Sequence, residues 1–242
     1  MILIVLIVCI LVFVLYKIIN TFYLEKLRNE PILICGKHNG RITKNINRNI
    51  LRLSKPNSGL SFTYSFWIYI KEWDMTGDEP RYILKMKGPN SQFGVILGSI
   101  SKKRISKYND LSVFISTHYN PEEKISVEDV PLQKWLHIAV ILENRNLDVF
   151  VNGKLYTTKI LKGIPILENS NLQVCPANKV NQIGFSGYIN SLRYYNKNIA
   201  YTDIIALFKK GHKCGSLFTS LSDFKSVLPS VNIKASAKVN LN

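Results

Sequence analysis

The acidic side chains are the first to consider for chemistry, because retaining glycoside hydrolysis needs two carboxylates about 5 Å apart. Glu72 and Asp74 have an alternating spacing, but the strand that would carry them ends there. The pairs Glu122-Glu123 and Glu128-Asp129 lie in loop-like sequence around one strand, which we interpret as a solvated edge. Since no strand carries a spaced pair of carboxylates, the sequence argues against a hydrolase and predicts that the protein is not an enzyme.

Cysteine and histidine offer no other reaction centre. The chain has four of each, without the C-x-x-C or H-x-x-x-H spacing of a structural zinc site. The sequence also lacks a glycine-rich loop that cradles phosphate and any nucleophile motif. We therefore expect no cofactor, with calcium as the alternative that is weighed below.

Most of the segments that position these residues are predicted to be β-strands. Residues 61–70 (SFTYSFWIYI) alternate with period two and are rich in aromatic side chains, which is typical of a strand. A meander follows at residues 137–158, where Asn152-Gly153 predicts a type I′ hairpin turn. One short helix is predicted, with Thr202 as N-cap and Gly211 after its last turn. Further strands are predicted at 81–86, 93–100, 111–117 and 134–142, and shorter ones at 32–35 and 50–53.

The N-terminus is a long apolar segment. Residues 1–16 carry no charge, and the apolar character resumes after Lys17 to about Leu24. A lysine near the end of a span can reach the headgroups, so residues 1–24 are predicted to form a single transmembrane helix. A cleaved signal peptide is the main alternative, but it should begin with a basic region and end in small residues, and neither is present.

The flanking charges bear on orientation. No Lys or Arg precedes the helix, whereas Lys26 and Arg28 follow it, which by the positive-inside rule keeps the C-terminal domain on the cytosolic side. The chain has no N-x-[ST] sequon, and the number of cysteines after the helix is odd. Lysine and arginine are abundant throughout, however, so a basic flank also arises by chance.

Three segments together resemble a known family. They are the aromatic strand at 61–70, Trp135-Leu136-His137-Ile138-Ala139 followed by a strand that ends in Asn152-Gly153, and the closing stretch GFSGYINSLRYYNKNIAYTDIIALFKKG. They are similar to the laminin-G-like branch of the concanavalin A-like lectin/glucanase superfamily over about residues 60–211. This resemblance implies an all-β fold, an antiparallel jelly-roll sandwich with one short C-terminal helix, here preceded by the transmembrane helix.

The residues that carry the resemblance are expected to determine the fold. Trp135 and His137 alternate, so they point to one face of a strand, where Trp135 is expected to fill the core and His137 to make an interior hydrogen bond. Gly187 is expected to allow a close backbone approach where a strand starts. The fold determinants that we predict are Trp67, Trp135, His137, Asn152, Gly153 and Gly187.

Two sites follow from the resemblance. Many relatives bind one Ca²⁺ at the rim of the sandwich through loop oxygens. The ligand candidates are Asp74, Asp78, Asn109 and Asp110, with Glu79 beside them, although simple turn formation explains the same residues. In a sandwich whose termini are adjacent, Cys35 could also meet Cys214 in a disulfide.

The expected organisation is an anchor at 1–24, a basic juxtamembrane connector at 25–58 that contributes first strands, a sandwich at 59–213 and a flexible basic tail at 214–242. With 32 Lys+Arg against 16 Asp+Glu, the net charge of +16 suits an anionic surface, and no nucleic-acid module is recognisable. We expect a non-catalytic membrane-anchored domain that contacts a protein or a glycan, with a calcium-dependent lectin or adhesin as the alternative. The chain also resembles proteins of large eukaryotic DNA viruses, which suggests a tether between the inner virion membrane and the capsid.

Overall fold

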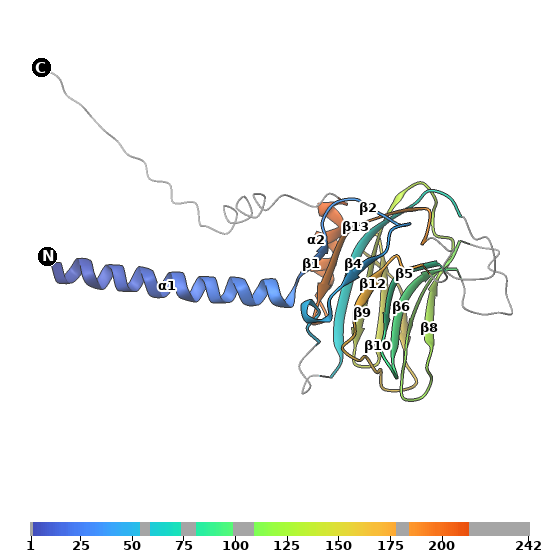
Figure 1. The fold of residues 1–242 in the computed structure, drawn as a ribbon, viewed down its shortest axis with the longest axis horizontal. Helices are drawn as coiled ribbons and strands as arrows, with labels where there is room; N and C mark the ends of the chain where they lie inside the picture. Colours follow the sequence, from blue (N-terminus) through green and yellow to red (C-terminus); the bar gives the residue numbers. More distant parts are fainter. Residues whose placement is uncertain (1, 54–58, 74–80, 99–108, 178–183, 213–242) are drawn as a thin grey trace, which may run out of the picture.

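The computed structural model describes residues 2–53, 59–73, 81–98, 109–177 and 184–212. It contains two antiparallel sheets packed face to face, a long N-terminal helix that projects away from them, and a short helix near the C-terminal end of the described chain (Figure 1). The expected all-β sandwich of jelly-roll type with one short C-terminal helix is confirmed.

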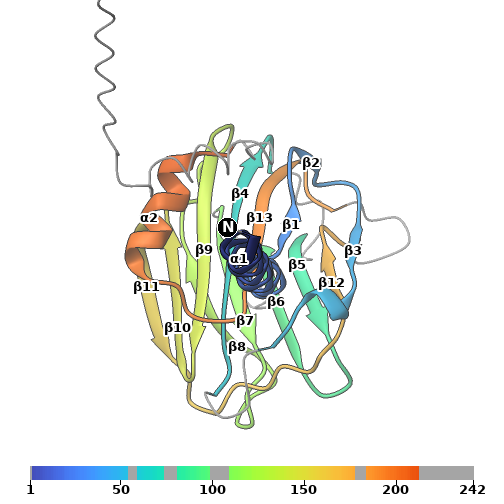
Figure 2. The ribbon, with the colours of Figure 1, turned by 90° about the vertical axis from the view of Figure 1, so that its left-hand side faces the viewer.

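The first sheet, here called sheet A, lies on the side of the N-terminal helix (Figure 2). A very short strand, β2 (His38–Asn39), also pairs with β13, a strand of nine residues, at its edge. In spatial order, the other strands of sheet A are β1 (Ile32–Ile34), β13 (Gly187–Tyr195), β4 (Ser61–Ile70), β9 (Trp135–Glu143), β10 (Asn146–Val151) and β11 (Lys154–Ile160).

The second sheet, sheet B, lies on the far side of the sandwich (Figure 1). Its neighbours are antiparallel throughout. In spatial order, its strands are β3 (Lys44–Ile46), β12 (Leu172–Val174), β5 (Arg81–Lys87), β6 (Gln92–Leu97), β7 (Leu111–Ile115) and β8 (Glu123–Val127).

The main core lies between the sheets and follows from the period-2 pattern. Alternate residues of β4, from Phe62 to Ile70, point toward sheet B and are buried there. Tyr64 stacks on Phe93 of β6, with ring centroids 5.3 Å apart and an interplanar angle of 16°. These aromatic contacts join the two sheets at the centre of the molecule.

The first strands belong to the sandwich itself. Residues 32–34 pair with β13, and residues 44–46 pair with β12. Leu33, Ile34, Ile46 and Leu51 are part of the buried core. The expected connector at 25–58 thus contributes first strands to the sandwich, as predicted, and the strands of the sandwich begin at Ile32.

One expected strand is absent from the described residues. Residues 50–53 were predicted to be extended, but the chain forms a 3-10 helix, η1 (Arg48–Ile50). The Oδ1 atom of its N-cap residue Asn47 accepts a hydrogen bond from the backbone N–H of Asn49 at 2.9 Å. This local hydrogen bond favours a turn, and Leu51 still reaches the core.

The hairpin between β10 and β11 has the predicted turn chemistry. Asn152 has φ of 50° and Gly153 has φ of 76°, the left-handed conformation that a type I′ turn requires at both central positions. The side chain of Asn152 accepts a hydrogen bond from the backbone N–H of His137 at 3.1 Å, and its own N–H donates to the carbonyl of His137 at 2.9 Å. Asn152 thereby ties the turn to β9.

The helix α2 (Tyr201–Lys210) covers the outer face of sheet A. Its buried residue Ile204 packs against Phe150 of β10 and Tyr195 of β13, which form a second, smaller core. The N-cap is Ala200, with no capping side chain, so the prediction of Thr202 at this position was wrong. Gly211, with φ of 79°, ends the helix as expected.

The helix α1 (Ile2–Asn29) contains the segment Leu6–Lys26, which is long and apolar enough to cross a bilayer, although a signal sequence would pass the same test. Its side chains are exposed along the described length. In Figure 2 the helix is seen end-on in front of sheet A, so it leaves the sandwich through the same face that carries α2.

Candidate functional site

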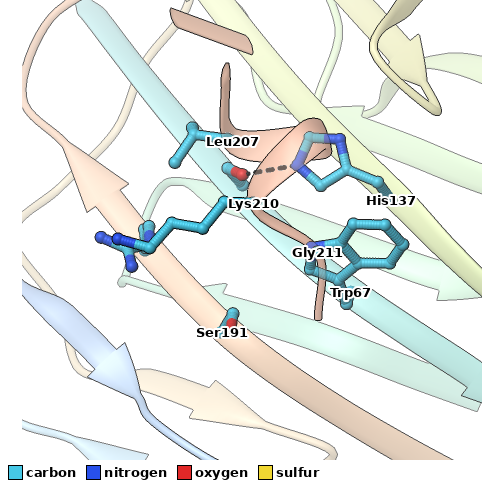
Figure 3. A pocket seen from close by; sticks show the side chains of 8 residues that line it. Trp67, His137, Ser191, Leu207, Lys210 and Gly211 are labelled. Atoms are coloured by element: carbon cyan, nitrogen blue, oxygen red, sulfur yellow. Dashed lines mark hydrogen bonds between the residues drawn. The ribbon is translucent and has the colours of Figure 1, made fainter. Parts of the chain in front are cut away.

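An enclosed polar cluster lies between sheet A and α2. Ser65 of β4 and His137 of β9 form a hydrogen bond, with 2.9 Å between Oγ and Nε2 (Figure 3). Beside them, Trp67 contacts the His137 ring and stacks on Phe208 of α2, with centroids 5.7 Å apart. The cluster therefore lies under the helix and not at an open surface.

A serine that is hydrogen-bonded to a histidine can act as a nucleophile in some enzymes. A catalytic histidine needs a third group that holds its other nitrogen, but Nδ1 of His137 is buried without a hydrogen-bond partner in the described part of the chain. Burial lowers the pKa of His137 to about 4. The exposed fractions of Ser65 and His137 are 2% and 0%, and the adjoining cavity of about 10 Å³ holds roughly one water molecule. The pair lies beneath α2 and supports its packing, but the cavity beside it is too small for a substrate.

Trp135 lies elsewhere than expected. It shares a face with His137, as the alternation predicted, but this is the outer face of sheet A and not the main core. Its ring is half-buried and stacks on His212, with centroids 4.6 Å apart and an interplanar angle of 9°. Since α2 and the residues after it cover part of this face, period-2 spacing alone could not tell which face would hold the tryptophan.

Glu123 is not the solvated carboxylate that the sequence suggested. Only 3% of the residue is exposed. Oε1 accepts hydrogen bonds from Thr117 Oγ1 at 2.8 Å and from the Gly163 N–H at 3.0 Å, and Oε2 accepts one from the Lys162 N–H at 2.9 Å. Burial raises the pKa of Glu123, but these hydrogen bonds and nearby Lys159 outweigh it, so the pKa lies below its ordinary value.

The other acidic candidates do not form a reactive pair among the described residues. Glu72 is exposed, accepts a hydrogen bond from Ser186 Oγ at 3.0 Å and lies 3.8 Å from a guanidinium nitrogen of Arg41. Its expected neighbour Asp74 lies outside the described residues. Glu128 and Asp129 are exposed, as predicted for an edge. The described chain thus places its carboxylates in structural roles.

The calcium candidates fall largely outside the described residues, because Asp74, Asp78 and Glu79 lie in the range 74–80. Asn109 and Asp110 are described and precede β7. Their carbonyls already accept hydrogen bonds from Val130 and Gly98, and Oδ1 of Asp110 is buried without a partner. Within the described chain no three His, Cys, Asp or Glu side chains gather to hold a metal, so the calcium site stays a prediction.

The cysteines divide into two groups. Cys9 and Cys175 are free thiols. Cys35 is disulfide-bonded, and its expected partner, Cys214, lies outside the described residues. The pairing of Cys35 with Cys214 therefore stays a prediction.

An aromatic row crosses the outer face of sheet A. Tyr188 of β13 lies directly opposite Tyr69 of β4, which lies opposite Trp135 of β9. The ammonium groups of Lys37 and Lys71 lie over the Tyr188 ring, 4.3 and 4.9 Å from its centroid. A hydrogen bond from Lys71 and its charge lower the pKa of Tyr188. We call these five residues the aromatic row.

The opposite outer face, on sheet B, carries a polar row. Asn45 of β3, Gln173 of β12 and Lys85 of β5 are direct cross-strand neighbours. A shallow depression beside them is lined by Asn45, Lys87, Asn171 and Gln173. The ammonium group of Lys85 lies 4.3 Å from the centroid of Tyr82, and burial, followed by the charge of Lys87, lowers its pKa.

Sequence reasoning missed this depression, which we call the polar depression. Its only local signal is a polar residue between two buried ones, as in Leu172-Gln173-Val174. The residues that line it come from three strands far apart in the chain. Asn45, Lys87 and Gln173 belong to sheet B, which Figure 1 shows as the layer farther from α1.

Comparisons with known proteins agree with this architecture. A family model described as the concanavalin A-like lectin/glucanases superfamily matches residues 48–204. The receptor binding domain of botulinum neurotoxin mosaic serotype C/D aligns with a TM-score of 0.56 at 13% identity, over 72% of this chain and 41% of that chain. The receptor binding domain of botulinum neurotoxin D gives a TM-score of 0.52 at 14% identity, over 73% of this chain and 43% of that one. The chain thus spans less than half the length of these two neighbours, and no curated protein matches it.

Proposed function

Because this chain belongs to the concanavalin A-like lectin/glucanases superfamily, we propose that it is a non-catalytic binding domain held on a membrane by α1. The apolar segment Leu6–Lys26 supports the anchor. The structural roles of Ser65, His137 and Glu123 support the absence of catalysis, since each is buried by its partners and none faces a substrate-sized cavity.

The polar depression is the observation that carries the proposed binding role. The amide side chains of Asn45 and Gln173 offer both donors and acceptors, and Lys87 adds a positive charge. Asn171 adds a donor, since its Oδ1 already accepts a hydrogen bond from the Arg48 N–H at 2.9 Å. This chemistry suits a ligand that presents hydroxyl or carboxylate groups, on a glycan or on a protein surface. The depression lies on sheet B, the layer farther from α1, so a bilayer around that helix would leave it accessible.

The proposed binding is tested with the full-length protein in detergent micelles on an array of neutral, sialylated and sulfated glycans, with calcium and with a chelator. We expect Lys87→Ala/Gln173→Ala to weaken any glycan binding at least about tenfold, which corresponds to about 1.4 kcal/mol. Lys124→Ala/Lys162→Ala, on β8 and in the segment after β11, outside the depression, is the control. Binding that the first variant leaves unchanged contradicts this site, and calcium-dependent binding favours the lectin alternative.

A protein ligand is the other outcome of the same design. If no glycan binds the folded protein, a photoreactive residue at position 173 should crosslink a defined partner that the same residue at position 124 does not. Such a partner fits a short tether between a membrane and a protein shell. On the resemblance alone, we propose the inner membrane of a virion facing its capsid as the setting.

The cytosol-facing orientation is likewise proposed from the charges that flank α1. The disulfide at Cys35 points the other way, because disulfides are rare in a reducing cytosol. In sealed microsomes from expressing cells, we expect added protease to digest the sandwich without detergent. Cys35 should react with a maleimide reagent only after reduction, as its disulfide requires. A sandwich that added protease cannot reach without detergent would show that the domain is lumenal.

A further inference from the structure

The helix α1 is joined to the sandwich without a free linker. The carbonyl and Oδ1 of Asn29, its last residue, accept hydrogen bonds from the backbone N–H and Nδ2 of Asn196, both at 3.1 Å. Glu30 forms an ion pair with Lys197 at 2.8 Å, and the carbonyl of Pro31 accepts from the Tyr194 N–H at 3.1 Å. These contacts fix the end of the helix against the end of β13.

The direction of the helix decides which face meets the membrane. Figure 1 shows α1 running across the direction of the strands, and Figure 2 shows it projecting from the outer face of sheet A. The candidate span ends at Lys26, three residues before the helix does, which is about 5 Å along the axis. If α1 crosses the bilayer near its normal, the outer face of sheet A lies at the headgroup level.

That face carries side chains typical of a membrane interface. In the aromatic row, Tyr69, Trp135 and Tyr188 are half-buried, so each is partly accessible from outside, and His212 covers one face of the Trp135 ring. Tyrosine and tryptophan are enriched where headgroups meet acyl chains, and lysines beside them attract lipid phosphates. Lys37 and Lys71 are exposed at one end of the row.

The acidic groups nearby leave this end of the face basic. Glu30 is paired with Lys197, and Glu72 lies beside Arg41 and accepts a hydrogen bond from Ser186. Asp203 is exposed in the first turn of α2, whose last turn carries Lys209 and Lys210. Glu143 of β9 and Asp148 of β10 lie toward the other end of this face. The end that carries Lys37 and Lys71 therefore complements an anionic surface.

We propose that the outer face of sheet A rests on the anionic lipid headgroups of the membrane that α1 spans, with Trp135 and Tyr69 at the interface and Lys37 and Lys71 on lipid phosphates. This inference rests on the proposed anchor but is independent of the ligand at the polar depression. The sandwich then lies flat on the bilayer, with the depression on the side away from it.

Tryptophan fluorescence can test this contact in the intact protein. The chain has three tryptophans, at 67, 73 and 135, and none lies in α1, so quenching by bilayer probes reports on the sandwich alone. Trp67 is 7% exposed beneath Phe208, and Trp73 packs against the main core. The full-length protein is placed in nanodiscs of phosphatidylcholine with phosphatidylserine, with and without brominated acyl chains, and intact mass verifies that residues 1–24 are retained.

We expect the brominated lipid to remove about one third of the emission, because one of the three tryptophans faces the lipid. Trp135→Phe should abolish this loss. Lys37→Ala/Lys71→Ala should at least halve it, as should discs of phosphatidylcholine alone. Lys124→Ala/Lys162→Ala, which removes the same charge from β8 and from the segment after β11, outside the aromatic row, should leave it unchanged.

Several outcomes would overturn the proposal. These are wild-type emission that the brominated lipid leaves unaltered, quenching that survives in Trp135→Phe, and equal quenching in both lysine variants. Thermal unfolding of each variant in the same discs shows that the sandwich is folded when it is measured. Loss of glycan or protein binding in Lys87→Ala/Gln173→Ala with normal quenching separates the two proposals.

Discussion

Replacing Glu123 by alanine is expected to lower the free energy of unfolding by about 3 kcal/mol, because three donors lose a charged acceptor inside the protein. The Lys162 and Gly163 N–H groups and the Thr117 hydroxyl all bond this carboxylate. It fastens the segment around residues 162–163 to the start of β8. Chemical denaturation of the full-length protein in micelles, followed by tryptophan fluorescence, measures the change.

Two further variants make this measurement specific. Glu123→Gln keeps one acceptor oxygen and should cost less than alanine does. Glu128→Ala, at an exposed position of the adjoining segment, should change the free energy by about 0.5 kcal/mol at most. A Glu123→Ala protein as stable as Glu128→Ala would show that the buried hydrogen bonds contribute nothing net.

The same carboxylate predicts a direction for the pH dependence. Its folded pKa is lowered, so its stabilisation is complete above the unfolded pKa and is lost as the pH falls through the folded one. His137 acts in the same direction. Its pKa falls from 6.5 to about 4 on burial, so the unfolded chain takes up the proton first as the pH drops across that range. Wild-type stability should therefore fall from pH 7 to pH 4 through His137, and the further fall below about pH 4.5 should be smaller in Glu123→Ala.

Replacing Gly187 by alanine should cost about 3 kcal/mol, at the upper end of overpacking effects. A Cβ at this position would overlap with the Tyr69 carbonyl oxygen and with the Phe185 ring, because both lie closer than van der Waals contact allows. The carbonyl belongs to the backbone of β4, which pairs with β13 at this point, so the two strands would have to separate. Thermal unfolding and amide exchange of β4 should both show the loss.

Gly36 provides the control for this substitution. It has open space around it, but its φ of 92° is unfavourable for other residues. Gly36→Ala should therefore cost about 1 kcal/mol from backbone strain alone. If Gly187→Ala costs no more than Gly36→Ala, the close approach of the strands is not what requires glycine there.

The sequence predicted the regular parts of the fold well. Residues 61–70 and 81–87 form strands because alternation and aromatic content are local signals, and Asn152-Gly153 forms the expected turn for the same reason. The short strands β2 and β3 have two and three residues, and their partners are more than 120 residues away. Nothing local could indicate where these strands pair.

The candidate sites were harder to predict, because they depend on contacts between distant segments. Glu123 was predicted to be solvated because its partners, the N–H groups of Lys162 and Gly163, are about 40 residues away in the sequence. Trp135 was assigned to the right group of side chains but to the wrong face, since α2 covers the outside of sheet A. The polar depression joins Asn45 to Gln173 across β3 and β12, a pairing that period-2 patterns cannot specify.

The hydrogen bonds between Asn29 and Asn196 fix the position of the sandwich relative to the end of α1. Paired sheets lie about 10 Å apart, so with a side-chain layer on each side the sandwich is on the order of 20 Å thick. If α1 spans a membrane as proposed, the contacts at its end hold the outer side of sheet B at one distance from the bilayer. A partner on that side would then lie within a few nanometres of the bilayer, at a gap set by the thickness of a single sandwich.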